Sequence, residues 1–370
     1  MATAVRNLGL AIVYSVLGAC SGGAKPPPGA SPSAAEPQAA PAVAAAQPPI
    51  AAAPAGPRAL RMAYSDWPGW VAWEIAAAKG WFKEAGVDLQ LVWLEYVPSM
   101  EAFSQNKVDA VCMTNGDALV LAGSGAQSVG ILINDYSNGN DMLVAAPQIE
   151  AIAQLRGKKI GVEIGFVDHL LLLQALKSAG LAESDVEIVN ERTHKTPALL
   201  ASGKVSAIAA WQPNSGQALE QVRGSKALFT SADVPGLIYD LLFVQPKSLR
   251  ERRAEWTKVV EVWDRVARYI GDPATRADAI KIMSARVRVE PAAYARFVDG
   301  TFILDLKANR QRFAKAEGFA SVYGSSLAVD KFNIENHIYK EPQVIDAALD
   351  PSLVEAILAK ASARELTARP

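Results

Sequence analysis

The stretch KVDAVCMTNGD (residues 107–117) is matched in outline by KVSAIAAWQPN (204–214), 97 residues further along the chain. Both begin with Lys-Val, continue through a short apolar run and end in polar residues typical of turns. Two further pairs have nearly the same offset: RMAYSD (61–66) with KIGVEI (159–164), and AGVDLQLV (85–92) with SDVEIVN (184–190). Because an offset shared by three segments indicates a repeated unit, the sequence predicts two lobes of the same plan.

Strand-like and helix-like patterns alternate around these repeated segments. ALRMAYSD (59–66) is typical of a strand, WVAWEIAAAKGWFKEAG (70–86) has helical spacing, and VDLQLVWLE (87–95) alternates like a second strand. Such alternation with short connections favours a parallel, doubly wound sheet in each lobe. The predicted fold class is therefore α/β.

Two extended segments, each bracketed by turn-forming residues, are suited to connect the lobes. They are NDYSNGNDMLVAA (134–146) and PGLIYDLLFVQP (235–246). We expect the chain to cross between the lobes at both segments. Asp141 and Asp240 are then residues of a two-segment hinge.

Helical patterns dominate from residue 247 onward. Trp256, Val260 and Trp263 belong to an apolar stripe at helical spacing, which predicts a helical C-terminal tail that packs on the first lobe. The predicted division assigns 58–140 plus 245–370 to lobe 1 with its tail, and 141–244 to lobe 2.

Residues 1–20 have the pattern of a secretory signal. Arg6 precedes an apolar run of about ten residues, too short to span a membrane as a mature helix. The string Leu17-Gly18-Ala19-Cys20 then resembles the lipobox of bacterial lipoproteins, which implies cleavage before Cys20 and lipidation of that residue. Ser21 resembles an outer-membrane retention signal. An ordinary cleaved signal is the alternative.

The composition of the remaining chain limits its class. Residues 21–57 are almost all Ala, Pro, Gly, Ser and Gln, which predicts a disordered tether without a core. The formal net charge is −1 and no basic run occurs, so nucleic acid is not an expected partner. Cys112, inside the apolar run DAVCMT, is expected to be a buried thiol, because no second cysteine follows Cys20 to form a disulfide.

Polar and aromatic residues gather where the predicted strands end. In open α/β sheets, ligands bind outside the carboxyl ends of the strands. The candidate ligand-binding residues at four such ends are Asp66, Trp67, Trp70, Asn115, Asp117, Glu163, Asp168, His169, Trp211 and Gln212. Helix capping is the alternative role for Asp117 and Asp168, and a structural role is the alternative for His169.

The four tryptophans of the segment SDWPGWVAWEIAAAKGW (65–81) divide into two pairs. Trp73 and Trp81 lie eight residues apart within the helical pattern and are expected in the core. Trp67 and Trp70 flank Pro68-Gly69, and indoles held by a turn are better placed to line a cleft.

Five short motifs, in this order, resemble a known family. They are GWFKEAGVDLQL, NKVDAVCMTNGDAL, LRGKKIGV, HLLLLQALKSAGL and LLASGKVSAIAAWQP. They are similar to the nitrate, sulfonate and taurine type of periplasmic solute-binding protein of ABC importers, which is related to thiamine-pyrimidine receptors. The resemblance covers roughly residues 58–245.

This resemblance implies the two-lobed, type II-like periplasmic-binding-protein fold, with two doubly wound sheets joined by a hinge. It implies a monomeric receptor that closes on a small solute and delivers it to an ABC permease. Together with the lipobox, it implies a periplasmic protein held by its N-terminal lipid to the outer membrane or cell envelope.

The charges at the strand ends argue for a cationic or zwitterionic solute. Asp66, Glu163 and Asp168 occupy these loops without a Lys or Arg beside them, and a carboxylate in a dry cleft requires compensation. A guanidinium, a urea-like molecule or a zwitterion such as taurine fits this pattern.

The loop NERTHKT (190–196), with Arg192, His194 and Lys195, argues the other way if it faces the cleft. An anion, either nitrate or an alkanesulfonate, is then the alternative solute. A thiamine-pyrimidine precursor is a further alternative.

The sequence carries no recognisable catalytic or metal-binding motif. HExxH, GxSxG, P-loop and GxGxxG patterns are missing, and the histidines and cysteines lack ligand spacing, so we predict no metal and no cofactor. Enzymes of the same fold include a thiamine-pyrimidine synthase branch with a cysteine-rich iron motif, which this chain lacks. We therefore expect a receptor rather than an enzyme, with a scaffold or adhesin as the third class.

Overall fold

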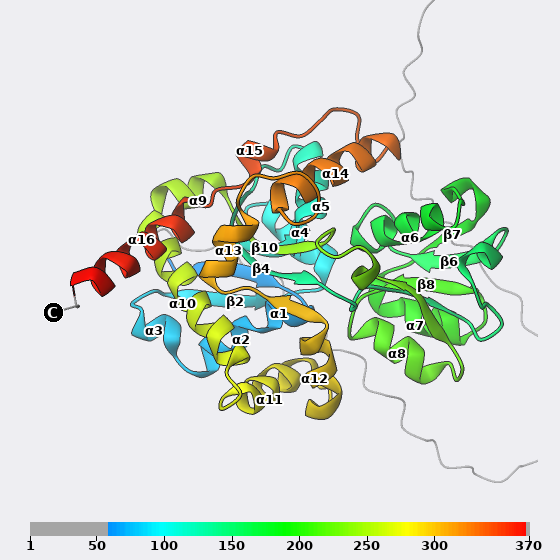
Figure 1. Cartoon of the computed structure of the whole chain (residues 1–370), viewed down its shortest axis with the longest axis horizontal. Helices are drawn as coiled ribbons and strands as arrows, with labels where there is room; N and C mark the ends of the chain where they lie inside the picture. The colour runs from blue at the N-terminus through cyan, green and yellow to red at the C-terminus, as the bar shows by residue number, and fades with distance from the viewer. Residues whose placement is uncertain (1–57, 368–370) are drawn as a thin grey trace, which may run out of the picture. The chain divides into compact units, whose positions relative to one another are not determined.

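The computed structural model describes residues 58–367 (Figure 1). The predicted signal peptide, the tether at 21–57 and the lipidation site Cys20 lie outside these described residues. No helix in residues 58–367 combines the length and the apolar character that a membrane crossing requires.

The first sheet has six strands in the order β11-β4-β10-β3-β1-β2. Their bounds are β1 (Leu60–Tyr64), β2 (Leu89–Trp93), β3 (Ala110–Thr114), β4 (Val129–Ser137), β10 (Tyr239–Val244) and β11 (Thr301–Ile303). β1 is parallel to β2 and β3, whereas β10 is antiparallel to both β3 and β4.

The second sheet has five strands in the order β7-β6-β8-β5-β9. Their bounds are β5 (Met142–Ala145), β6 (Lys159–Val162), β7 (Glu187–Asn190), β8 (Ala207–Ala210) and β9 (Lys226–Thr230). β6 is parallel to β7 and β8, and β5 is antiparallel to β8 and β9.

The two sheets confirm the repeated plan that the sequence predicts. β2-β1-β3 of the first sheet corresponds to β7-β6-β8 of the second, with the same parallel pairing. The sheets are mixed rather than purely parallel as predicted. The reason is that β10 and β5, the strands that arrive from the opposite lobe, run against their neighbours.

The chain crosses between the sheets at two places, as the hinge prediction requires. β4 ends at Ser137 and β5 begins at Met142, and β9 ends at Thr230 before β10 begins at Tyr239. The Ser231 hydroxyl joins the two crossings, because it lies 2.6 Å from Ser137 Oγ and accepts from the Gly139 amide at 2.7 Å. The return crossing precedes β10, whereas the sequence places the lobe boundary at 244–245.

Helices cover both sheets (Figure 1). Those of the first half are α1 (Pro68–Val71), α2 (Trp73–Ala78), α3 (Trp81–Glu84), α4 (Tyr96–Ser104), α5 (Asn115–Gly123), α6 (Val167–Ser178), α7 (Thr196–Ala201) and α8 (Asn214–Gln221). Those of the tail are α9 (Pro246–Glu251), α10 (Arg253–Gly271), α11 (Arg276–Val287), α12 (Pro291–Asp299), α13 (Leu306–Arg312), α14 (Val322–Glu335), α15 (Ile345–Ala348) and α16 (Ser352–Thr367).

The helical tail packs on the first lobe, as predicted. The stripe on α10 is buried, and Trp263 meets Trp73 with ring centroids 4.7 Å apart. Trp73 and Trp81 are both buried in this core, which confirms their predicted role. The segment 70–86 is divided into three short helices rather than one, with Gly80 in the left-handed conformation between α2 and α3.

Candidate functional site

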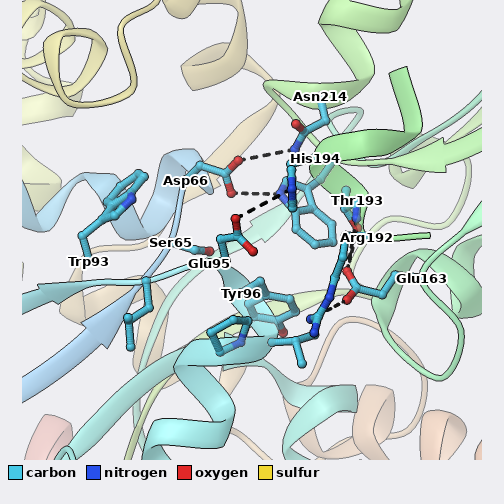
Figure 2. A pocket seen from close by; sticks show the side chains of 14 residues that line it. Ser65, Asp66, Trp93, Glu95, Tyr96, Glu163, Arg192, Thr193, His194 and Asn214 are labelled. Carbon is cyan, nitrogen blue, oxygen red and sulfur yellow. Dashed lines mark hydrogen bonds and ion pairs between the residues drawn. The ribbon is translucent and has the colours of Figure 1, made fainter. Parts of the chain in front are cut away.

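A cavity of about 80 Å³ lies where strand ends of the two sheets meet; we call it the outer pocket (Figure 2). It is lined by Ser65, Asp66, Trp93, Leu94, Glu95, Tyr96, Val97, Pro98, Glu163, Arg192, Thr193, His194, Trp211 and Asn214. Asp66, Glu95 and Tyr96 follow strands of the first sheet, and Arg192 and Trp211 follow strands of the second. The site therefore obeys the strand-end rule.

A second, smaller cavity of about 10 Å³ shares Tyr96 and Trp211 with the outer pocket; we call it the inner chamber. It is lined by Trp67, Trp70, Tyr96, Thr114, Asp141, Val167, Trp211, Ile238 and Asp240. A volume of this size holds about one water-sized group.

Asp66 links the two lobes across the outer pocket. Its Oδ1 accepts from Trp211 Nε1 at 3.1 Å and its Oδ2 accepts from Asn214 Nδ2 at 3.4 Å (Figure 2). Burial raises the pKa of Asp66, and these two hydrogen bonds oppose the shift. Burial therefore disfavours the ionised form of Asp66 relative to that of an exposed aspartate.

The loop after β7 supplies the cationic side of the outer pocket. Arg192 donates to Glu163 Oε1 at 3.1 Å, and the Thr193 hydroxyl donates to Glu163 Oε2 at 3.1 Å. His194 Nε2 lies 3.7 Å from Glu95 Oε1, so it approaches the first lobe (Figure 2). The loop thus faces the pocket, which is the condition under which the sequence favoured an anion.

Aromatic rings form the walls of the inner chamber. Tyr96 stacks on Trp70 with centroids 5.1 Å apart and meets Trp211 edge-on at 5.3 Å. Trp67 lies 6.3 Å from Trp70, and both indoles are almost fully buried. The Tyr96 hydroxyl accepts from the Thr114 amide at 3.1 Å and donates to Asp117 Oδ2 at 2.5 Å, so two hydrogen bonds fix the hydroxyl end of the ring.

Five buried aspartates surround the chamber and the hinge: Asp117, Asp135, Asp141, Asp168 and Asp240. Burial raises the pKa of Asp117 and of Asp141 to about 7, and that of Asp135 to about 8. Burial and then the neighbouring carboxylates raise the pKa of Asp168 and Asp240 well above the ordinary range. Much of this negative charge is therefore neutralised by protons near neutral pH.

The Pro68-Gly69 turn approaches one of these aspartates closely. An added Cβ at Gly69 would lie 1.6 Å from Asp135 Oδ2, so a larger residue there requires the turn or the Asp135 carboxyl group to move. Asp135 Oδ1 also accepts from Trp67 Nε1 at 2.9 Å. The turn that positions Trp67 and Trp70 is thus fixed against β4.

The structure places seven of the ten predicted ligand-binding residues at or beside these cavities. Asp66, Glu163 and Trp211 line the outer pocket, and Trp67, Trp70 and Trp211 line the inner chamber. Asp117 accepts from Tyr96, which lines both cavities. Asp168 accepts from Thr193, which lines the outer pocket. The hinge residues Asp141 and Asp240 also line the chamber.

The other three predicted residues make structural contacts away from both cavity linings. Asn115 donates to the hydroxyls of Ser325 and Ser326 on α14 and accepts from the Tyr239 amide. Gln212 accepts from the Gly216 amide, and His169 accepts from the Gly165 amide through Nδ1. These bonds fix the first turns of α5, α8 and α6.

Sequence reasoning missed Trp93, Glu95 and Tyr96, and left the role of Arg192 and His194 open. The signal was available, because Glu95 and Tyr96 follow β2 and the Arg192–His194 loop follows β7. The candidates named from sequence follow β1, β3, β6 and β8, whereas these residues follow the two flanking strands, where the same rule holds. Among the described residues, no group of His, Cys, Asp and Glu is arranged to hold a metal ion.

The fold and site define a two-lobed binding-protein architecture, and comparisons with known proteins specify the family. The family model described as NMT1/THI5 like matches residues 68–275. The chain belongs to the NMT1/THI5-like family.

The curated relatives include several proteins named for binding, and two of them show the degree of similarity. A Brucella abortus binding protein is 29% identical over 176 residues, covering 47% of this chain and 54% of that protein. An aliphatic sulfonates-binding protein of Escherichia coli K12 is 27% identical over 179 residues, covering 46% and 54%. The chain thus spans about half the length of the curated relatives it matches.

Solved structures share the fold at low sequence identity. The periplasmic aliphatic sulphonate binding protein SsuA of Escherichia coli matches with a TM-score of 0.66 at 19% identity, covering 81% of this chain and 99% of that one. The periplasmic nitrate-binding protein NrtA of Synechocystis PCC 6803 gives 0.64 at 12% identity, covering 81% and 88%. The desulfurization enzyme DSZB gives 0.60 at 16% identity, covering 82% and 99%, so enzymes also use this fold.

Proposed function

We propose that this chain is the extracytoplasmic solute-binding component of an ABC importer and that it binds a small oxyanion of the sulfonate type in the outer pocket. The relatives named for sulfonate and nitrate binding support this solute class. They favour the anionic alternative over the cationic solute that the strand-end charges predict.

The observation that carries the proposal is the set of hydrogen-bond donors in the outer pocket. Arg192, Thr193 and His194 come from one loop, and Trp211 and Asn214 come from the next strand end. Trp211 and Asn214 donate to Asp66, and Arg192 donates to Glu163, so carboxylate oxygens already occupy these donors. A sulfonate presents oxygens of the same kind to the same donors.

The acids of the pocket do not oppose this assignment. Asp66 accepts from Trp211 Nε1 and Asn214 Nδ2, and Glu163 is paired with Arg192, so each of these carboxylates already has donors that offset its charge.

Isothermal titration with ethanesulfonate, nitrate, guanidinium and a thiamine-pyrimidine precursor tests the solute class. We expect ethanesulfonate to bind best, and Arg192→Gln to weaken it at least tenfold, because a charge-assisted donor is lost. Arg310→Gln, at an exposed position on α13, is the matched control and should leave the affinity unchanged.

The solute affinity of the Asp66→Asn variant shows whether the solute is an anion or a cation. For an oxyanion this change removes a competing carboxylate and should preserve or strengthen binding. Strong binding of guanidinium that Asp66→Asn abolishes would reinstate the cationic solute and overturn the proposal.

We propose a receptor rather than an enzyme. The described part of the chain holds one cysteine, Cys112, which is fully buried in β3, and burial raises the pKa of its thiol well above the usual value. A receptor returns its solute unchanged. Recovery of a desulfonated product after incubation with an alkanesulfonate would contradict this part of the proposal.

A further inference from the structure

We propose that Asp135, Asp141 and Asp240 form a proton-dependent switch in the hinge: the lobes close with these carboxyl groups protonated, and ionisation of the groups opens the cleft. We call the three residues the hinge acids. The switch goes beyond the proposed function, because it acts on the lobes with or without solute and does not depend on which solute the outer pocket binds.

The hinge acids lie where the chain crosses between the sheets. Asp141 directly precedes β5, and its carbonyl oxygen accepts from the Ser231 amide of the return crossing at 2.9 Å. Asp240 lies near the start of β10, opposite Asp135 of β4 in the strand register. A charge on these residues therefore acts at the segments that must bend when the lobes move.

Each hinge acid has a buried oxygen that lacks a donor. The three residues are at most 2% exposed, and within residues 58–367 their Oδ2 atoms have no hydrogen-bond partner. An ionised carboxylate in such a position is costly, whereas the protonated carboxyl group is neutral and loses less solvation. The closed arrangement of the lobes therefore favours the protonated form.

The surroundings of the hinge acids add negative charge and no compensating cation. Asp117 of α5 and Asp168 of α6 face them, as does Tyr294 of α12. In the part of the chain that the structure describes, the lining of the inner chamber includes no Lys, Arg or His. Protons are thus the available source of neutralisation while the lobes are closed.

Lobe opening changes this environment. Asp141 and Asp240 line the inner chamber, and the second lobe contributes Val167 and Trp211 to the wall that closes it. When the lobes separate, these two side chains move away and water reaches the carboxyl groups. Hydration lowers the pKa of each acid toward the ordinary value of 3.8, so opening releases protons and closure takes them up.

The sign of the pH dependence follows from this difference between the two forms. In the closed form, burial raises the pKa of Asp141 to about 7 and that of Asp135 to about 8. The closed form therefore holds more protons between about pH 5 and 8, and closure becomes less favourable as the pH rises through this range. At higher pH the acids are ionised in both forms, and the dependence levels off.

Small-angle X-ray scattering of the full-length protein without solute tests the switch by itself. We expect the radius of gyration to increase between about pH 5.5 and 8, because the lobes open as the hinge acids ionise. Asp141→Asn cannot ionise and should reduce this increase. Asp88→Asn, at an exposed position of the first lobe, is the matched control and should retain it.

Isothermal titration with ethanesulfonate measures the coupling to solute binding. A sulfonate stays ionised over this range, so any proton taken up on binding goes to the protein. We expect proton uptake at about pH 6.5, and an affinity about tenfold weaker at pH 7.5 than at pH 5.5, because an uptake of about half a proton over two pH units gives this factor. Titrations in buffers of different ionisation enthalpy count the protons.

A second variant separates the hinge from the mouth of the outer pocket. His194 Nε2 lies 3.7 Å from Glu95 Oε1 of the other lobe, and a histidine also gains a proton in this pH range. The pH dependence of the radius of gyration should persist in His194→Gln. If His194→Gln abolishes it, the switch lies at that contact and the proposal is wrong.

The remaining outcomes distinguish the switch from the proposed function. A radius of gyration independent of pH, or the same pH dependence in Asp141→Asn as in the unaltered protein, overturns the switch while the receptor stands. Failure to bind ethanesulfonate at any pH contradicts the proposed function, and the scattering without solute then decides on the switch. If Asp141→Asn does not fold, Asp240→Asn takes its place in both measurements.

Discussion

At the scale of single residues, the site depends on carboxyl groups that are buried with incomplete hydrogen bonding. Oδ2 of Asp135 and Oδ1 of Asp168 have no hydrogen-bond partner among the described residues, in addition to Asp141 and Asp240. Their environment makes them partly protonated, so their chemical role differs from that of an exposed aspartate. A count of acids in the sequence is for this reason a weak guide to the charge of the solute.

Gly69 provides a residue-level prediction about the turn that carries Trp67 and Trp70. Gly69→Ala places a Cβ 1.6 Å from Asp135 Oδ2, so either the turn moves or the Asp135 carboxyl group shifts and disturbs its hydrogen bond with Trp67 Nε1. We expect a loss of about 1–3 kcal/mol in the free energy of unfolding, measured by urea denaturation.

The matched control is Gly271→Ala at the end of α10, where an added Cβ meets nothing within 4 Å. It should leave the free energy of unfolding nearly unchanged. A Gly69→Ala protein as stable as the Gly271→Ala protein would show that the turn does not press on Asp135.

At the scale of elements, the sequence predicted most strands and missed how they combine. The offset of 97–98 residues located β1 with β6 and β3 with β8, because duplicated segments keep their apolar pattern. β5 and β10 run antiparallel to their neighbours because the chain enters each of them from the other lobe. No local sequence pattern indicates this direction. Similarly, Gly80 ends α2 at a position that helical spacing alone would have continued.

The hinge elements give a prediction about pH. The pKa values of Asp117, Asp135 and Asp141 rise from 3.8 to about 7–8 on folding, so the folded protein binds more protons than the unfolded chain between these values. The free energy of unfolding should therefore fall as pH rises from about 5 to 8. Thermal unfolding across this range measures the slope.

Asp135→Asn separates the hinge from other titrating groups. An asparagine can still accept from Trp67 Nε1 but cannot ionise, so the variant should lose less stability between pH 5 and 8 than the original protein. If the free energy of unfolding depends on pH identically in the two proteins, Asp135 does not contribute to this pH dependence.

At the scale of the whole molecule, two copies of one plan enclose a site that neither lobe contains alone. The fold class was predictable because it follows from repetition and alternation along the chain. The site was predictable only in part, because Tyr96 and the Arg192–His194 loop are brought to Trp211 by tertiary packing. Asn115 and His169 also follow strand ends, but their side chains make structural hydrogen bonds, with Ser325 and with the Gly165 amide.

The proposed attachment to the envelope is also a property of the whole chain. The lipobox ending at Cys20 predicts that the protein expressed in a Gram-negative host fractionates with membranes and incorporates labelled palmitate. Cys20→Ala should abolish the labelling, whereas Cys112→Ala should retain it. Labelling that survives Cys20→Ala would contradict the lipoprotein assignment.

A crystal structure of the protein grown with ethanesulfonate decides whether the outer pocket binds an oxyanion. We expect sulfonate density in the outer pocket, with oxygens within hydrogen-bond distance of Arg192 and of Trp211 Nε1. Sulfonate bound elsewhere, or an outer pocket that stays closed around the Asp66–Trp211 contact at saturating ethanesulfonate, would contradict it.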